Sequence, residues 1–319
     1  MTRLVYILGY GRSGSTFLSL LLGNHKDIQA VGELSCFTNR SQAGAFRWKG
    51  YLPCSCLGDT WLHEDSGPNR NKCAFWNEVQ SLSTKSNPPN YLESYPLLQH
   101  KFERYRNFAH LLMNRISHST EYTRYADITT TLLKSILEVS KKAIIVDSSK
   151  NPIRAYALTM IPNLDLRIIH MVRDGRGVAW SQKSRYRRKV WVRGNISAKP
   201  VFKTALHWTV ANLLSESVKS QLHPSKSTIV RYEDLVSNPH VELKKIGDLM
   251  EIDLSSLSDM LSHNKNIKLG HSVAGNRLRM RNEIRMNPDT EWIGKLSTPE
   301  KHGFWLLSGW LMRRYGYTK

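Results

Sequence analysis

The sequence predicts an α/β fold: a doubly wound parallel sheet with helices on both faces and a phosphate-loop-like turn. Short apolar runs rich in β-branched residues alternate with amphipathic segments, and the glycine-rich turn follows the first run. Continuous apolar runs of this length suit strands that are buried on both faces of a parallel sheet. The alternation also favours right-handed crossovers through helices. The expected strands are Leu4–Leu8, Ala143–Val146, Leu166–Val172 and Ser227–Val230.

Helices are expected between and after these strands, several of them beginning with Pro, Ser, Thr or Asp at a plausible cap. The expected helices are Thr16–Gly23, Lys101–Ser117, Thr129–Lys141, Ile153–Met160, Arg176–Lys183, Lys203–Gln221, Pro239–Met250 and Pro299–Tyr315. Residues 35–96 break the rhythm with Gly, Pro, Asn, Ser and cysteines, so we expect an irregular insertion there. Without repeats or long linkers, residues 1–319 are expected to form a single domain.

Composition and charge narrow the class of protein. Hydrophobic residues make up 40% and charged residues 23%, which disfavours disorder and coiled coil. Lys and Arg number 46 against 26 Asp and Glu, so the formal net charge is +20. That surplus indicates an anionic partner, for which nucleic acid, an acidic membrane, an acidic polymer and a charged nucleotide all qualify. With neither a targeting segment nor a bilayer-spanning run apparent, a cytoplasmic protein is expected.

The strongest local signal is the turn between the first expected strand and the first expected helix. It reads Gly9-Tyr10-Gly11-Arg12-Ser13-Gly14-Ser15-Thr16. Both end glycines and Thr16 fit the phosphate-loop pattern G-x-x-x-x-G-K-[ST], but Ser15 replaces its lysine. Backbone N–H groups and the helix dipole of such a turn point at an anion. Because the lysine is missing, hydrolysis of ATP or GTP is disfavoured, and Arg12 supplies a permanent cation in the turn instead. The alternative to an anion-binding turn is an ordinary glycine turn that joins a strand to a helix.

A second motif follows a later expected strand. Arg173 leaves the carboxyl end of Leu166–Val172, and Ser181 lies eight residues further on, in the next expected helix. Ligands of open α/β sheets bind outside the carboxyl ends of the strands. The two motifs in this order resemble the sulfotransferases that use 3′-phosphoadenosine 5′-phosphosulfate (PAPS), whose loop reads [KR]-S-G-[ST]-[ST].

The resemblance implies PAPS as sulfuryl donor and 3′,5′-ADP as product. It implies that the loop Gly11-Arg12-Ser13-Gly14-Ser15-Thr16 binds the 5′-phosphosulfate, with Arg12 also catalytic, and that Arg173 and Ser181 hold the 3′-phosphate. Two weaker pieces also resemble the family, Arg231-Tyr232-Glu233-Asp234-Leu235 and the late basic segment at 275–281. Arg277 and Arg279 in that segment are candidates to close over the 3′-phosphate, although it departs from the R-K-G pattern of cytosolic members. No metal is expected to be required, since the loop lacks the triphosphate lysine.

Sulfuryl transfer also needs a base that removes the acceptor's proton. Cytosolic members of the family use a His, whereas many carbohydrate and tyrosine sulfotransferases use a Glu shortly after the phosphate-loop helix. Glu33 matches the second case and is expected at the end of a second strand, on the same sheet edge as the loop; a capping or solvated carboxylate is the alternative. His170 is expected to be a buried strand histidine rather than the base. Lys150 could contact sulfate or acceptor, and Asp147 or Ser149 could instead cap a helix.

The cysteines leave three interpretations open. Cys54 and Cys56, with Cys73 and with Cys36 or His63 nearby, supply enough ligands for zinc. The spacing C-x-C departs from the usual C-x₂₋₄-C, so a disulfide or free thiols remain alternatives, free thiols being favoured, and no metal ligand is assigned.

The stretch from Arg173 to Arg193 carries eight basic residues and one acidic residue. An RNA-binding arm would look similar, but a lid over an anionic or sugar acceptor is favoured because the stretch continues the expected 3′-phosphate helix. The function expected is therefore sulfuryl transfer to a hydroxyl or amine of a sugar, phenol or lipid acceptor, without nucleic acid as partner. A P-loop kinase and a basic RNA-binding protein are the alternatives.

Overall fold

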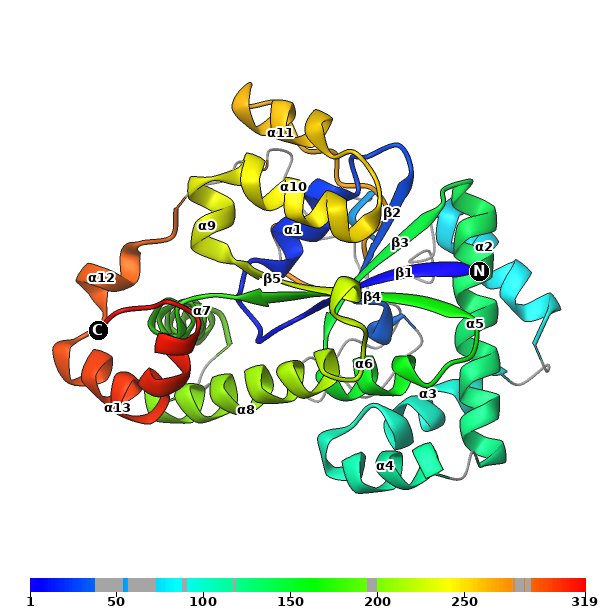
Figure 1. Cartoon of the computed structure of the whole chain (residues 1–319), viewed down its shortest axis with the longest axis horizontal. Coiled ribbons are helices and arrows are strands. Elements are labelled where there is room, and N and C mark those ends of the chain that lie inside the picture. Colours follow the sequence, from blue (N-terminus) through cyan, green and yellow to red (C-terminus); the bar gives the residue numbers. More distant parts are fainter. Residues whose placement is uncertain are drawn as a thin grey trace.

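In the described part of the chain, five parallel strands form a central sheet in the order β2-β3-β1-β4-β5 (Figure 1). The structure, a computed structural model, describes residues 1–37, 54–56, 73–87, 91–116, 119–193, 200–276, 278, 284 and 288–319. The strands are β1 Thr2–Leu8, β2 Ile28–Gly32, β3 Ile144–Lys150, β4 Leu164–Val172 and β5 Ser227–Arg231. The predicted doubly wound parallel α/β fold is confirmed.

Helices connect the strands and cover both faces of the sheet (Figure 1). They are α1 Ser15–Leu22, α2 Ala74–Lys85, α3 Tyr91–Phe102, α4 Phe108–Ile116, α5 Thr120–Ser140, α6 Pro152–Thr159, α7 Gly175–Arg193, α8 Val201–Lys219, α9 Tyr232–Ser237, α10 Pro239–Met250, α11 Ser255–Ser262, α12 Glu291–Lys295 and α13 Thr298–Arg314. Among the helices of the described residues, none has both the length and the apolar composition needed to cross a bilayer.

Alternating side chains of β1 divide the core between the two faces. Leu4, Tyr6 and Leu8 pack with residues of α2, α3, α5 and α6. Val5 and Ile7 pack with residues of α1, α10 and α11 on the opposite face. This period of two is the pattern of a strand buried on both sides. Near the carboxyl end of β4, a third cluster joins α7, α8 and α13.

The insertion is not irregular throughout, because residues 35–96 contain α2 and the first part of α3. Only a narrow stripe of α2 is buried, Trp76, Val79 and Ser83, so its helical period was hidden among polar residues. Helix α5 begins nine residues before the predicted start, after the N-cap Ser119. Helix α6 is capped by Asn151, whose Oδ1 accepts from the N–H of Ile153 at 2.9 Å. Asp147 and Ser149 therefore do not cap that helix.

The register aligns the carboxyl ends of the central strands. Leu8 at the end of β1 pairs with Lys150 of β3 on one side and with His170 of β4 on the other. After β1, the chain continues toward one side of the sheet, where β2 is the outer strand. After β4, it continues toward the opposite side, where β5 is the outer strand. Reversals of this kind open a crevice beyond the carboxyl ends, where ligands of α/β sheets bind.

Candidate active site

The turn between β1 and α1 has a backbone conformation that requires glycine, as its sequence predicts. Gly14 has φ +93° and forms the N-cap of α1. A Cβ at Gly14 would lie 2.5 Å from the Tyr232 ring at the start of α9, so both conformation and space require glycine. A Cβ at Gly11 would meet nothing within 4 Å, so one side of the turn is open. The turn is therefore packed against α9 but accessible at Gly11.

The structure brings both sequence motifs together at this turn. The Nε of Arg12 donates to Ser181 Oγ at 2.8 Å. Arg173 Nη1 donates to the carbonyl oxygen of Arg12 at 3.1 Å. Three of the residues expected to bind the donor thus meet at the ends of β1 and β4.

Two serines and a threonine complete the turn. Ser13 and Ser15 are buried, and Ser13 Oγ has no hydrogen-bond partner among the described residues. Thr16 Oγ1 accepts from the N–H of Asn276 at 3.3 Å. A buried hydroxyl without a partner is costly, and an anion bound in the turn would supply one.

Arg173 is almost fully buried among groups that hold its guanidinium. Its Nη2 pairs with Asp289 Oδ2 at 2.8 Å, and its Cζ lies 4.6 Å from the centre of the Tyr232 ring. The adjacent Asp174 N–H donates to Glu233 Oε1 at 3.0 Å, which ties the end of β4 to α9. Burial raises the pKa of the Glu233 carboxyl, although the hydrogen bonds that it accepts oppose this.

Glu33 lies directly beyond β2, as the sequence predicted, and pairs with Lys150 at the end of β3. The Nζ of Lys150 is 2.5 Å from Glu33 Oε1. Gly275, with φ +91°, lies between Glu33 and the turn: a Cβ there would be 3.5 Å from Glu33 Oε1 and 3.3 Å from Thr16 Oγ1. Glu33 is therefore close to the phosphate-loop turn, and Lys150 contacts this carboxylate in the structure.

A buried ionic network holds the chain that follows Glu33. Asp147 Oδ1 accepts from the N–H of Leu34 at 3.3 Å, and its Oδ2 lies 3.4 Å from Arg154 Nε. Arg154 is fully buried and also pairs with Glu103. Asp147 thus positions the Glu33 turn instead of capping a helix.

His170 is a buried strand histidine, in line with expectation. Its Nε2 hydrogen-bonds to Asn212 Oδ1 at 2.9 Å. Asn212 Nδ2 donates to the carbonyl of Trp208, so Oδ1 is the acceptor for the His170 ring N–H. Burial lowers the pKa of His170 to about 4, which keeps the ring neutral at physiological pH.

Arg277, Arg279 and His63 lie outside the described residues, as do the side chains of the basic stretch from Arg185 onward. No disulfide joins any of the four cysteines, all of which lie in the described residues, and Cys36 lies beside Glu33, apart from the other three. Asp289 was not anticipated, because nothing in the sequence pattern links it to Arg173 across 116 residues.

Comparison with known proteins agrees with this architecture. The chain is similar to the sulfotransferase domain from the curacin biosynthetic pathway, with 17% identity and a TM-score of 0.55 over 100% of this chain and 99% of that chain. It is similar to the sulfotransferase domain from the Synechococcus PCC 7002 olefin synthase, with 17% identity and a TM-score of 0.55 over 100% and 96%. It is also similar to sulfotransferase STF9 from Mycobacterium avium, with 11% identity and a TM-score of 0.50 over 99% of this chain and 78% of that chain.

At these identities the solved structures establish the fold alone. No curated protein is significantly similar in sequence. A sequence model of the Sulfotransferase family matches residues 5–256, a range that contains the turn, Glu33, Arg173 and Ser181. Because the match covers most of the chain, this protein is an enzyme of the sulfotransferase family.

Proposed function

We propose that this protein transfers a sulfuryl group from PAPS to a hydroxyl or amine of an acceptor, without a catalytic metal. Membership of the sulfotransferase family implies the PAPS donor. The single observation that carries the proposal is the convergence of Arg12, Ser181 and Arg173 at the ends of β1 and β4. Two guanidinium groups and the backbone N–H groups of the turn suit a ligand with several phosphate-like charges.

The residues of the turn fit such a donor. The buried Ser13 Oγ has no partner among the described residues, and the turn is open at Gly11. We assign the 5′-phosphosulfate to the six residues Gly11, Arg12, Ser13, Gly14, Ser15 and Thr16. We assign the 3′-phosphate to Arg173 and Ser181, with Arg277 and Arg279 as further contacts proposed from the sequence.

PAPS, when bound, supplies an activated sulfuryl group. Arg12 and the turn's N–H groups would stabilise the negative charge that develops on the donor's phosphate oxygen as the bond to sulfur breaks. The carboxylate of Glu33 would accept the proton that leaves the acceptor's hydroxyl or amine. Lys150 holds one oxygen of Glu33, so its contribution is to orient the carboxylate toward the turn.

Ligand-dependent melting tests the proposal. A ligand that binds only the native state raises the melting temperature, so 3′,5′-ADP is expected to stabilise the parent protein more than ATP–Mg²⁺ or RNA. Arg12→Ala is expected to lose that stabilisation. A larger shift with ATP–Mg²⁺ would support a kinase, and RNA binding that survives Arg12→Ala would support an RNA-binding protein; either result would contradict the proposal.

A screen of compounds with different hydroxyl groups would identify the class of acceptor. Sugars, phenols and lipids with free hydroxyl groups should be incubated with the enzyme and radiolabelled PAPS. The proposal expects label on at least one of these classes, and transfer should fall with Glu33→Gln. Label appearing equally with heat-denatured protein would contradict enzymatic transfer.

A further inference from the structure

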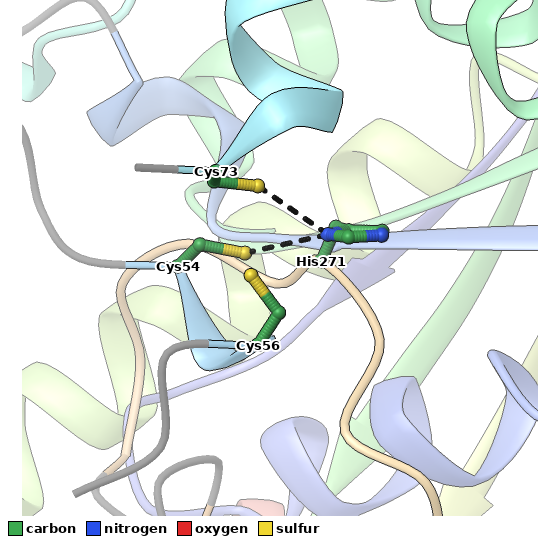
Figure 2. Close-up of side chains that lie close together, drawn as sticks. All are labelled: Cys54, Cys56, Cys73 and His271. Carbon is green, nitrogen blue, oxygen red and sulfur yellow. Dashed lines mark hydrogen bonds between the residues drawn. The ribbon is translucent and has the colours of Figure 1, made fainter. Parts of the chain in front are cut away.

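Three thiols and an imidazole converge outside the residues of the donor turn, although they come from distant parts of the chain. They belong to Cys54, Cys56, Cys73 and His271 (Figure 2). Their Sγ and Nδ1 atoms all lie within 4.8 Å of one another. The sulfotransferase chemistry proposed above uses none of them.

We propose that Cys54, Cys56, Cys73 and His271 bind one structural zinc ion. Three thiolates and one imidazole form a donor set that tetrahedral Zn²⁺ accepts at closed, structural sites. On binding, the three thiol protons are released to solvent while His271 coordinates as the neutral ring through Nδ1. The oxidation state of the metal and of sulfur stays unchanged, so no redox partner is required.

The distances between the ligand atoms fit a tetrahedron. Zinc bonds of about 2.3 Å to sulfur and 2.0–2.1 Å to nitrogen separate neighbouring sulfur and nitrogen ligands by roughly 3.6 Å. In the structure, His271 Nδ1 lies 3.4 Å from Cys73 Sγ and 3.8 Å from Cys54 Sγ. Figure 2 shows both sulfur atoms directed at the same ring nitrogen, with Cys56 beside them. A disulfide would use two of the three thiols and leave the imidazole without a role.

Neighbouring side chains hold the four candidate ligands in position in the structure without a metal. The Phe75 ring stacks on the His271 ring at 4.6 Å with an interplanar angle of 11°. Trp76 Nε1 donates to the His271 carbonyl at 2.9 Å. Ser55, between the first two cysteines, donates through Oγ to the carbonyl of Gly270 at 2.9 Å. Cys54 and Cys73 are buried whereas Cys56 is exposed, which leaves a path for the ion from solvent.

The cluster lies where a bound metal would stabilise the contact between the segment after His271 and the end of β2. Val273, two residues after His271, bridges Cys54 on one side and Gly32 at the end of β2 on the other. Its carbonyl accepts from the N–H of Glu33 at 2.8 Å. Zinc would therefore fasten the segment that runs from His271 to Gly275 against the edge of the sheet, next to Glu33 and the turn.

Metal content tests this without any sulfuryl transfer, so its outcome is independent of the proposed function. The protein should be produced without a polyhistidine tag, and its metals measured by inductively coupled plasma mass spectrometry. About one zinc per chain is expected for the parent, and well below half for Cys56→Ser and His271→Ala. Cys56→Ser is informative because an exposed thiol can be replaced with little disturbance of packing. Cys36→Ser is the matched control, since this cysteine lies outside the cluster, and it should keep its zinc.

A second measurement covers the case in which a variant folds poorly. Removing zinc from the parent with a strong chelator should lower its melting temperature, and added Zn²⁺ should restore it, whereas Cys56→Ser should respond to neither treatment. Parent protein without zinc, zinc that persists in both variants, iron in its place, or a disulfide among the three cysteines in non-reduced peptide maps would each overturn the proposal.

Discussion

Arg12 Nε donates a hydrogen bond of 2.8 Å to Ser181 Oγ, joining residues that are 169 positions apart in the chain. Arg173 adds a bond of 3.1 Å to the Arg12 carbonyl. Because the ends of β1 and β4 and the helix α7 hold these groups, an anion bound in the turn would meet cations that are already positioned. Prior positioning of this kind reduces the side-chain ordering that binding would otherwise require.

The first prediction concerns Arg173. Replacing it by alanine should weaken 3′,5′-ADP binding by roughly 1.5–3 kcal/mol, the range for a hydrogen bond to a charged group. Titration calorimetry measures this directly. AMP lacks the 3′-phosphate and should therefore bind the parent more weakly than 3′,5′-ADP does. Its affinity should differ little between the parent and Arg173→Ala.

Lys183→Ala provides the control for Arg173→Ala. Lys183 is a cation on α7 whose Nζ pairs with Glu300 at 2.6 Å. Its loss should leave 3′,5′-ADP affinity near that of the parent. Equal affinities of the parent and Arg173→Ala for 3′,5′-ADP would contradict the assignment of the 3′-phosphate to Arg173.

Local patterns in the sequence were enough to predict the parallel sheet and to single out the turn, Arg173 and Ser181, which the structure brings together. The turn, Arg173 and Ser181 follow directly from strands whose apolar runs are visible, and Glu33 follows from the short return along β2. Cys54, Cys56 and Cys73 were candidate zinc ligands in the sequence, but His271 was missed, because it meets them only through a tertiary approach of residues 198 positions apart, Cys73 and His271. Helix α2 was missed for another reason: most of its residues are polar and only one stripe is buried.

The second prediction is that Mg²⁺ does not affect transfer. Ser15 stands in place of the phosphate-loop lysine, and the proposed donor has no triphosphate for the metal to bridge. Rates in buffer freed of divalent ions by a resin should equal rates with added Mg²⁺. Strong chelators are avoided here because they would also remove the proposed zinc. Activity that depends on Mg²⁺ would favour a kinase.

The third prediction concerns pH and His170. Burial lowers the pKa of His170 to about 4, below the value near 6.5 of an unfolded chain. The stability contributed by this neutral ring is therefore present above pH 6.5 and declines as the pH falls toward 4. Between pH 7 and 5 it should account for a loss of about 2 kcal/mol in the free energy of unfolding.

Urea unfolding of the parent and of His170→Gln at both pH values checks this. Gln does not titrate and can still bond to Asn212, so the variant should lose about 2 kcal/mol less than the parent over that interval. Identical pH dependence in the two proteins would show that His170 is accessible to protons in the native state, and would reopen its candidacy as the base.

The last prediction separates chemistry from binding at Glu33. If this carboxylate takes the acceptor's proton, Glu33→Gln should keep the 3′,5′-ADP affinity and lower turnover by roughly 10²–10⁴, the usual contribution of a positioned base. Gln has nearly the same shape but cannot accept the proton. Single-turnover transfer at saturating PAPS and acceptor, compared across pH, measures the chemical step.

Glu138→Gln is the matched control, because Glu138 is an exposed carboxylate on α5, and its turnover should equal that of the parent. A purely structural Glu33 predicts a different pattern: the loss of its contact with Lys150 would lower the melting temperature, while the folded fraction would turn over at a near-normal rate. A rate for Glu33→Gln within a factor of about three of the parent, far less than the loss of a base would cause, would remove Glu33 from the mechanism. Lys150, which shares the same sheet edge, would then be the next side chain to test.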